Sequence, residues 1–302
     1  NMAQGKDVVA SQVIHFKEAF HGRSGYTLSL TNTNDPRKYL YFPNFDWPRI
    51  TNPKLHIPLT EDSLQETISQ EKIAIQQIEE ALAQNPNDIA CLIIEPIQAE
   101  GGDNHFRPEF FQQLRKICDA HEILLILDEV QTGLAMTGKM WAYQHYDIIP
   151  DLICFGKKSQ VCGILGNKAK FDQVEHHVFQ ESSRINSTFG GNFIDMLRFQ
   201  IILEIMEKED LAAKAEHMGR YLLEQVQKLV TKYPQMSAAR GLGLVVAFDF
   251  ETAAQRNDFI NRSLENKLLI LGCGEKSVRF RPHLTVSTAE IDQAIGLIEQ
   301  SL

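Results

Sequence analysis

The sequence is poor in cysteine and tryptophan. Its 302 residues include 5 cysteines and 2 tryptophans, and no two cysteines stand in a CxxC spacing. So few cysteines, odd in number, argue against a disulfide framework and predict reduced core residues, as in a cytoplasmic protein. The histidines also lack the spacing of a metal site, so we expect no bound metal. The cysteines are Cys91, Cys118, Cys154, Cys162 and Cys273.

Long apolar runs and excess positive charge are also missing. The longest apolar runs, such as 123–127 and 268–271, are far shorter than the roughly 20 residues that cross a bilayer. The first residues do not resemble a secretory signal. A formal net charge of −9 argues against nucleic-acid binding, which needs clustered lysine and arginine. We therefore expect an acidic cytoplasmic enzyme with no membrane or nucleic-acid partner.

What the sequence does contain is an alternation of short apolar runs and amphipathic segments. The runs 91–95, 123–129 and 152–158 are continuously apolar and end in charged residues. Such runs are typical of strands buried on both faces of a parallel sheet. Helical patterns at 61–83 and 108–120 separate them. The first two thirds of the chain therefore predict an α/β domain, a mostly parallel sheet covered by helices.

The last third has a different pattern. It predicts a long, mostly helical stretch at 193–233 and a closing helix that begins with a capping box, Ser287 with Glu290. Three strands are expected between them, at 242–250, 268–271 and 278–280. We therefore predict a large domain over residues 1–210 and a smaller C-terminal α+β domain over 211–302.

Three strand ends carry side chains that could do chemistry. Ligands of open α/β sheets bind at the carboxyl ends of the strands, where Glu95, Asp128 and Lys158 are expected. Burial would lower the pKa of Lys158 and make it a nucleophile for a carbonyl cofactor. Lys157 would point the other way if strand alternation continued. Spacing alone leaves open that Lys158 is an ordinary surface lysine, but an Asp128 carboxylate could hold a pyridinium nitrogen beside it.

Longer motifs extend over nearly the whole chain. DEVQTG and TGKMWAYQHYDIIPDLICFGKK resemble the signature region of class III pyridoxal-phosphate (PLP) aminotransferases, most closely the L-lysine 6-aminotransferase group. The resemblance continues in FHGRSGYTLSLTNT, EPIQAEGGDNHFRPEFF, SRINSTFGGN and VRFRPHLTVSTAEID. It implies PLP fold type I, a PLP cofactor and a homodimer with shared active sites.

The resemblance assigns roles around the cofactor. Lys158 would bond covalently to PLP and then carry protons, and Asp128 would hold the pyridine nitrogen. Val130 would pack under the ring, and Gln131 would hydrogen-bond its phenolic oxygen. The glycine at 163 falls where the class keeps one after its lysine, which favours Lys158 over Lys157.

The remaining cofactor residues lie in two other motifs. Phe20 would stack on the second face of the ring, and His21 follows it in the same motif. Ser187 and Thr188 would donate to the phosphate, in this class from the neighbouring subunit. From the residues alone, Phe20 could equally be core, and a structural role for His21 is favoured over a catalytic one.

Substrate binding is assigned to arginines and acids. Arg23 resembles the residue that binds the α-carboxylate of lysine, and Arg279 the one that binds 2-oxoglutarate. Glu100 would cover Arg279 while an amine donor is bound. Glu95 and Asn186 are also expected near the substrate. Because Arg281 alternates with Arg279 on a strand, we expect one of the two to face solvent or an ion pair.

The implied activity moves the ε-amino group of L-lysine to 2-oxoglutarate, giving 2-aminoadipate 6-semialdehyde and L-glutamate. One alternative is a transaminase for 4-aminobutyrate or another ω-amino acid, since FHGR and FDWP are similar in that group. Another is an inactive fragment. The class has a glycine- and serine-containing loop that cradles the PLP phosphate before the FHG motif, and this sequence starts too late to contain it.

Overall fold

A six-stranded sheet forms the larger part of the molecule. The computed structural model describes residues 1–302, apart from the side chain of Ala3. The sheet has the order β2-β1-β3-β4-β5-β6, in which all neighbours are parallel except the antiparallel pair β5 and β6. Its strands are β1 Gln12–Phe16, β2 Arg49–Ile50, β3 Ile89–Ile94, β4 Leu124–Asp128, β5 Leu152–Phe155 and β6 Gly163–Gly166.

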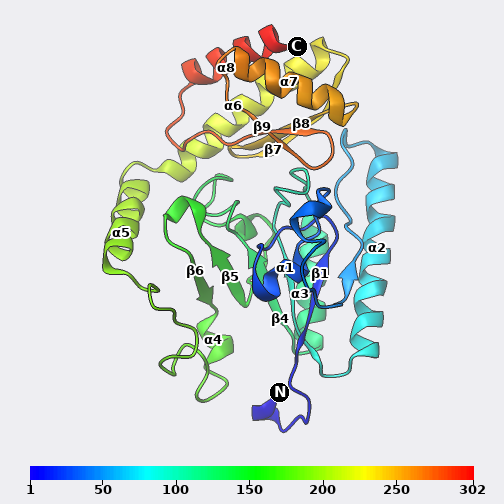
Figure 1. Cartoon of the computed structure of the whole chain (residues 1–302), viewed down its shortest axis with the longest axis vertical. Helices are drawn as coiled ribbons and strands as arrows, with labels where there is room; N and C mark the ends of the chain where they lie inside the picture. Colours follow the sequence, from blue (N-terminus) through cyan, green and yellow to red (C-terminus); the bar gives the residue numbers. More distant parts are fainter.

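Helices α2 (Glu61–Gln84) and α3 (Pro108–Ala120) pack beside this sheet (Figure 1). Helix α3 buries Phe110, Phe111 and Leu114 in one core with Phe16 of β1 and Leu125 of β4. Two short helices, α1 (Gly25–Leu30) and α4 (Lys168–Phe171), lie in the connections. Single 3₁₀ turns span Met2–Gln4, Pro36–Lys38, Ala142–His145 and Lys157–Ser159.

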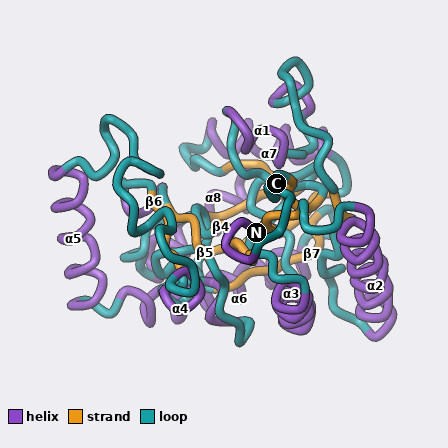
Figure 2. Tube along the Cα trace, turned by 90° about the horizontal axis from the view of Figure 1, so that it is seen from below, coloured by secondary structure: helices purple, strands orange, loops and turns teal.

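A four-stranded antiparallel sheet forms the smaller part, at the top of Figure 1. Its order is β7-β8-β10-β9, and its core includes Phe248, Phe250 and Phe259. The strands are β7 Met236–Leu242, β8 Val245–Phe250, β9 Leu271–Cys273 and β10 Ser277–Phe280. The helices of this part are α6 Leu211–Lys232, α7 Ala253–Glu265 and α8 Thr288–Ser301, whereas α5 Phe193–Lys208 lies beside β6 of the large sheet (Figure 1). Figure 2 shows α5 at one edge of the molecule, far from α2 at the other.

The mostly parallel α/β sheet with a smaller α+β part confirms the predicted fold class. Helix α3 and the Ser287–Glu290 capping box also match their predictions. The domain division between residues 210 and 211 stays a prediction.

Three predicted elements were wrong in detail. The expected strand 242–250 is a hairpin that turns at Gly243, where φ is +55° and a side chain would lie 2.4 Å from the backbone of Thr137. The helical stretch 193–233 breaks at Asp210, whose φ is +48°. The strand expected at 268–271 starts only at Leu271. In the first two cases a single residue with a positive φ, Gly243 or Asp210, interrupts an element that the apolar pattern continued.

All five cysteines are free thiols. Cys91, Cys118 and Cys273 are buried and Cys154 is half-buried, but Cys162 is exposed, so its assignment to the core was wrong. Among the described residues, no helix has the length and apolar character that crossing a membrane requires. The described side chains also include no cluster of three or more His, Cys, Asp and Glu arranged for a metal ion.

Candidate active site

The carboxyl ends of three neighbouring parallel strands meet in the middle of the large sheet. Glu95 directly follows β3, and Asp128 is the last residue of β4. Lys158 follows β5 in the 3₁₀ turn Lys157–Ser159. Because β3, β4 and β5 are paired in register, their ends lie at one edge, as the sequence predicted.

Asp128 is held by two contacts on its own side of the site. His21 Nδ1 donates to Oδ2 at 2.9 Å, and the Val130 amide donates to Oδ1 at 3.1 Å. Burial lowers the pKa of His21, but its hydrogen bond and charge interaction with Asp128 outweigh this and raise the pKa above its usual 6.5. The His21 side chain is only 1% exposed. The interpretation of His21 as structural missed this direct contact with Asp128.

The Lys158 amine lies over the loop that follows Asp128. Its Nζ donates to the Gln131 carbonyl at 2.9 Å. Burial, followed by the charge of Arg281, lowers the pKa of Lys158 from 10.5 to about 8. A larger fraction of this amine is therefore neutral, and so nucleophilic, at neutral pH than of an ordinary lysine.

The physical argument that separated Lys157 from Lys158 was wrong. Strand β5 ends at Phe155, so strand alternation does not reach either lysine. Instead, the 3₁₀ turn leaves Lys157 exposed with a φ of +34° and Lys158 half-buried. Gly163, on the antiparallel partner strand, faces Phe155 so closely that a Cβ would lie 2.4 Å from its ring.

Both carboxylate oxygens of Glu95 accept hydrogen bonds from backbone amides. Its two oxygens accept hydrogen bonds from the Phe20 amide at 2.9 Å and the Ala99 amide at 3.1 Å. Burial raises the pKa of Glu95 to about 7. The carboxyl therefore ties the Phe20 segment to the end of β3, and the Phe20 ring is half-buried with Lys38 Nζ 6.0 Å from its centroid.

Arg279 of β10 reaches down from the small sheet to Glu100, at 2.6 Å. Burial by itself would raise the pKa of Glu100. The charge and hydrogen bond of Arg279 lower it, and the resulting pKa lies below its usual value. The Nε and Nη1 atoms of Arg279 are buried without a partner among the described residues. Arg281 forms a second pair, with Asp103. Both arginines are thus in ion pairs, and neither faces solvent.

The contacts above link nine of the predicted residues to this region, and the other four are exposed. Those near it are Phe20, His21, Glu95, Glu100, Asp128, Val130, Gln131, Lys158 and Arg279. Arg23, Asn186, Ser187 and Thr188 are exposed on the surface of this chain. Sequence reasoning expected solvent or an ion pair for one of the two arginines but missed Asp103, the partner of Arg281. The signal for it was a second acid in the loop that follows Glu100.

These residues fit the ring and aldehyde ends of PLP. Lys158 supplies an amine with a lowered pKa, and Phe20 supplies an aromatic face. Each Asp128 oxygen accepts only one hydrogen bond in the described structure, so a lone pair remains for a protonated ring nitrogen. At the phosphate end, the predicted donors Ser187 and Thr188 are exposed on the surface of this chain.

Sequence comparisons agree with this geometry. The aminotransferase class-III family matches residues 2–302. The L-lysine-epsilon aminotransferase of Mycobacterium tuberculosis is 47% identical over 304 residues, which cover 100% of this chain and 67% of that protein. The 4-aminobutyrate aminotransferase of Dictyostelium discoideum is 36% identical over 96% of this chain and 57% of its own length.

A structural comparison points the same way. The solved lysine aminotransferase from M. tuberculosis, in its internal aldimine form, superimposes with a TM-score of 0.95 at 47% identity. The match covers 100% of this chain and 69% of the solved chain. The fold is therefore PLP fold type I, and the chain belongs to the class III aminotransferases, which are PLP-dependent enzymes.

Proposed function

We propose that this protein transfers the ε-amino group of L-lysine to 2-oxoglutarate. The products are 2-aminoadipate 6-semialdehyde and L-glutamate. The choice of lysine rests on the relatives named for it, which are 43–47% identical to this chain. The choice of a dicarboxylate acceptor rests on the geometry around Arg279.

The Arg279–Glu100 contact is the observation that carries the proposal. Glu100 meets only one nitrogen of Arg279, at 2.6 Å, and the other two nitrogens are buried without a described partner. Buried donors without partners cost free energy, so the site favours a ligand that satisfies them. A carboxylate matches the arginine fork with two parallel hydrogen bonds. Glu100 therefore covers Arg279 for a monocarboxylate donor and yields to a dicarboxylate.

The proposed roles of Lys158, Asp128 and His21 follow from the contacts that these residues make. Bound PLP supplies an aldehyde that takes up the amino group and a ring that withdraws electrons from the reacting carbon. The Lys158 amine, whose pKa is lowered to about 8 by burial, would move the proton at that carbon when it is neutral. Asp128 keeps the ring nitrogen protonated, and the His21 hydrogen bond orients the Asp128 carboxylate.

We also propose a homodimer whose sites are shared. Helix α5 exposes a row of large apolar side chains: Phe193, Ile194, Leu197, Ile201 and Ile205. Such a patch is typical of an interaction surface. The segment that leads into α5 carries Asn186, Ser187 and Thr188, all exposed. A second copy docked here would receive these donors at its own Lys158, which gives the phosphate its missing partners.

Mixing two inactive variants tests the sharing. K158A lacks the amine and S187A/T188A lacks the hydroxyls, so neither sustains turnover alone. A mixed dimer contains one site with both parts intact, and activity returns on mixing. If mixing restores nothing while sedimentation shows mixed dimers, the sites are not shared.

The visible absorbance of the chain with PLP, before and after L-lysine, tests the activity. A yellow band that lysine bleaches and 2-oxoglutarate restores is the expected result. A band that 4-aminobutyrate bleaches faster than lysine at equal concentration would assign the chain to the alternative donor. A chain that PLP cannot turn yellow contradicts the proposal and indicates an inactive fragment.

A further inference from the structure

The loop of residues 100–103 presents two carboxylates to the small sheet. Glu100 pairs with Arg279, and Asp103 pairs with Arg281. Arg279 lies in β10, and Arg281 directly follows Phe280, the last residue of that strand. Two ion pairs therefore join this loop of the large sheet to the end of β10 in the small sheet.

The two pairs differ in strength. The Glu100 side chain is 21% exposed and has a second cation, Lys38, at 3.5 Å. The Asp103 side chain is fully buried, and its two oxygens meet both terminal nitrogens of Arg281, Nη1 at 2.9 Å. Two-pronged arginine–carboxylate contacts are stronger and fix orientation. The Glu100 pair is thus built to exchange partners and the Asp103 pair to stay closed.

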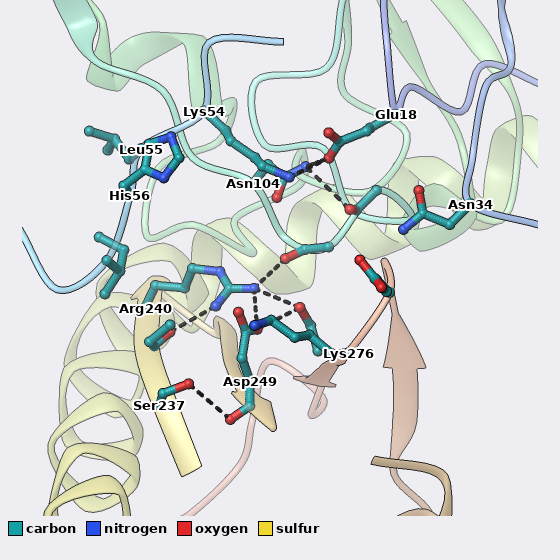
Figure 3. Close-up of a pocket in the computed structure, with 16 residues that line it drawn as sticks. Glu18, Asn34, Lys54, Leu55, His56, Asn104, Ser237, Arg240, Asp249 and Lys276 are labelled. Atoms are coloured by element: carbon teal, nitrogen blue, oxygen red, sulfur yellow. Dashed lines mark hydrogen bonds and ion pairs between the residues drawn. The ribbon is translucent and has the colours of Figure 1, made fainter. Parts of the chain in front are cut away.

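Arg240 of β7 holds the same loop from a third direction. Its Nε donates to the Asp103 carbonyl at 3.0 Å, and its Nη2 donates to the Gly102 carbonyl. Asp249 and Ser277 fix the guanidinium, each with an oxygen 2.9 Å from Nη2. Figure 3 shows Arg240 beside Asp249, with Asn104 and Glu18 on the opposite side of a cavity of about 390 Å³.

The backbone of this loop is packed closely against the backbone of Glu18 and Gly274. The Gly274 amide donates to the Glu100 carbonyl at 2.8 Å. A Cβ on Gly101 would lie 2.4 Å from the Glu18 carbonyl oxygen, and one on Gly274 would lie 2.7 Å from the Gly101 carbonyl oxygen. A shift of the loop backbone would therefore break these close contacts, whereas the Glu100 side chain is 21% exposed at the surface of the loop.

We propose that Asp103, Arg281 and Arg240 form a clasp of positioning residues that holds this loop and Arg279 in register, so that Glu100 alone leaves when a dicarboxylate binds. The inference rests on the proposed function. Removing one partner of a buried ion pair leaves an uncompensated charge. An unpaired Arg281 would then compete with Arg279 for Glu100 and for the incoming carboxylate.

The variant D103N breaks the clasp with little change of shape. We expect its KM for 2-oxoglutarate to rise about tenfold, since small misplacements of binding groups have effects of this order, and its KM for the amine donor to change less than about twofold. R281K keeps the charge but loses the two-pronged contact, so its effect should be intermediate. D151N is the matched control, because Asp151 is a buried carboxylate paired with Arg115, 2.9 Å apart, outside the site.

Amide hydrogen exchange supplies a second measurement that needs no cofactor and no turnover. D103N should accelerate exchange at residues 101–104 and at the Gly274 amide, and D151N should not. If D103N does not fold, R240Q removes the hydrogen bonds to Gly102 and Asp103 and should accelerate exchange at the same amides.

The outcomes separate this inference from the proposed function. Equal effects of D103N on donor and acceptor KM, or unchanged exchange at 101–104, overturn the clasp. A wild-type chain that PLP and lysine do not affect overturns the activity. In that case faster exchange in D103N would still support the clasp, and unchanged exchange would overturn it as well.

Discussion

Two regions of the molecule differ in how their side chains are contacted: those of one are buried and paired within the chain, and those of the other are exposed. At the strand ends, Glu95, Asp128 and His21 are buried and find their partners inside the chain. On the segment 183–205, Phe193 is 91% exposed and Ile194 is 75% exposed. The difference teaches that the strand-end residues find their partners within one chain, whereas the apolar row of α5 is an exposed surface of the kind on which the proposed dimer rests.

Among variants at the strand ends, K158A should have the largest effect. Losing the proton carrier alone should lower turnover by about 10²–10⁴-fold, and the yellow colour with PLP should disappear. K157A is the matched control, because its lysine is the exposed neighbour in the same turn. Turnover and absorbance measure both effects. A yellow, active K158A together with a colourless K157A would reverse the assignment.

D128N should have the next largest effect. The asparagine keeps the shape but loses the charge that holds a ring proton, so we expect turnover to fall about 10²–10³-fold. The exposed carboxylate Asp119 gives the control, D119N, for which turnover should stay at the wild-type value. Steady-state kinetics with PLP in excess decides. Wild-type turnover in D128N would separate Asp128 from the chemistry.

The pH dependence of Schiff-base formation should reveal the lowered pKa of the Lys158 amine. The neutral form of Lys158 is the nucleophile, and its pKa is about 8. The rate of PLP addition should therefore rise about tenfold per pH unit below 8 and level off above it. An ordinary lysine, with a pKa of 10.5, would give a rate that still rises past pH 9. Stopped-flow absorbance distinguishes the two profiles.

The smallest effect on folding stability is expected for a variant on the exposed apolar row of α5. L197D places a charge on the apolar row of α5, where Leu197 is 58% exposed, and should change the unfolding free energy of the separate chain by less than about 0.5 kcal/mol. It should nevertheless weaken self-association in sedimentation. M206D is the control, because Met206 of the same helix is buried and its variant should lose folding stability. Unchanged association in L197D would contradict the proposed dimer surface.

Much of the fold was predictable because apolar periodicity reflects burial directly. The continuous runs at β3 and β4 marked strands covered on both faces, and the stripe of α3 marked a helix packed on them. The hairpin at Gly243 was not predictable, because the apolar run passes through the turn. Gly243 packs against the backbone of Thr137, more than 100 residues earlier in the chain, and local pattern does not reveal such a contact.

The sequence by itself placed Glu95, Asp128 and the lysine pair 157–158 at strand ends, since each apolar run ends in these charged residues, and the family resemblance at Gly163 then favoured Lys158. Only the tertiary structure decided their partners. It set His21 against Asp128, Arg281 against Asp103 and Arg240 across the loop of residues 100–103. These contacts join residues 107 to 178 positions apart, and local pattern carries no information about pairs so distant in sequence.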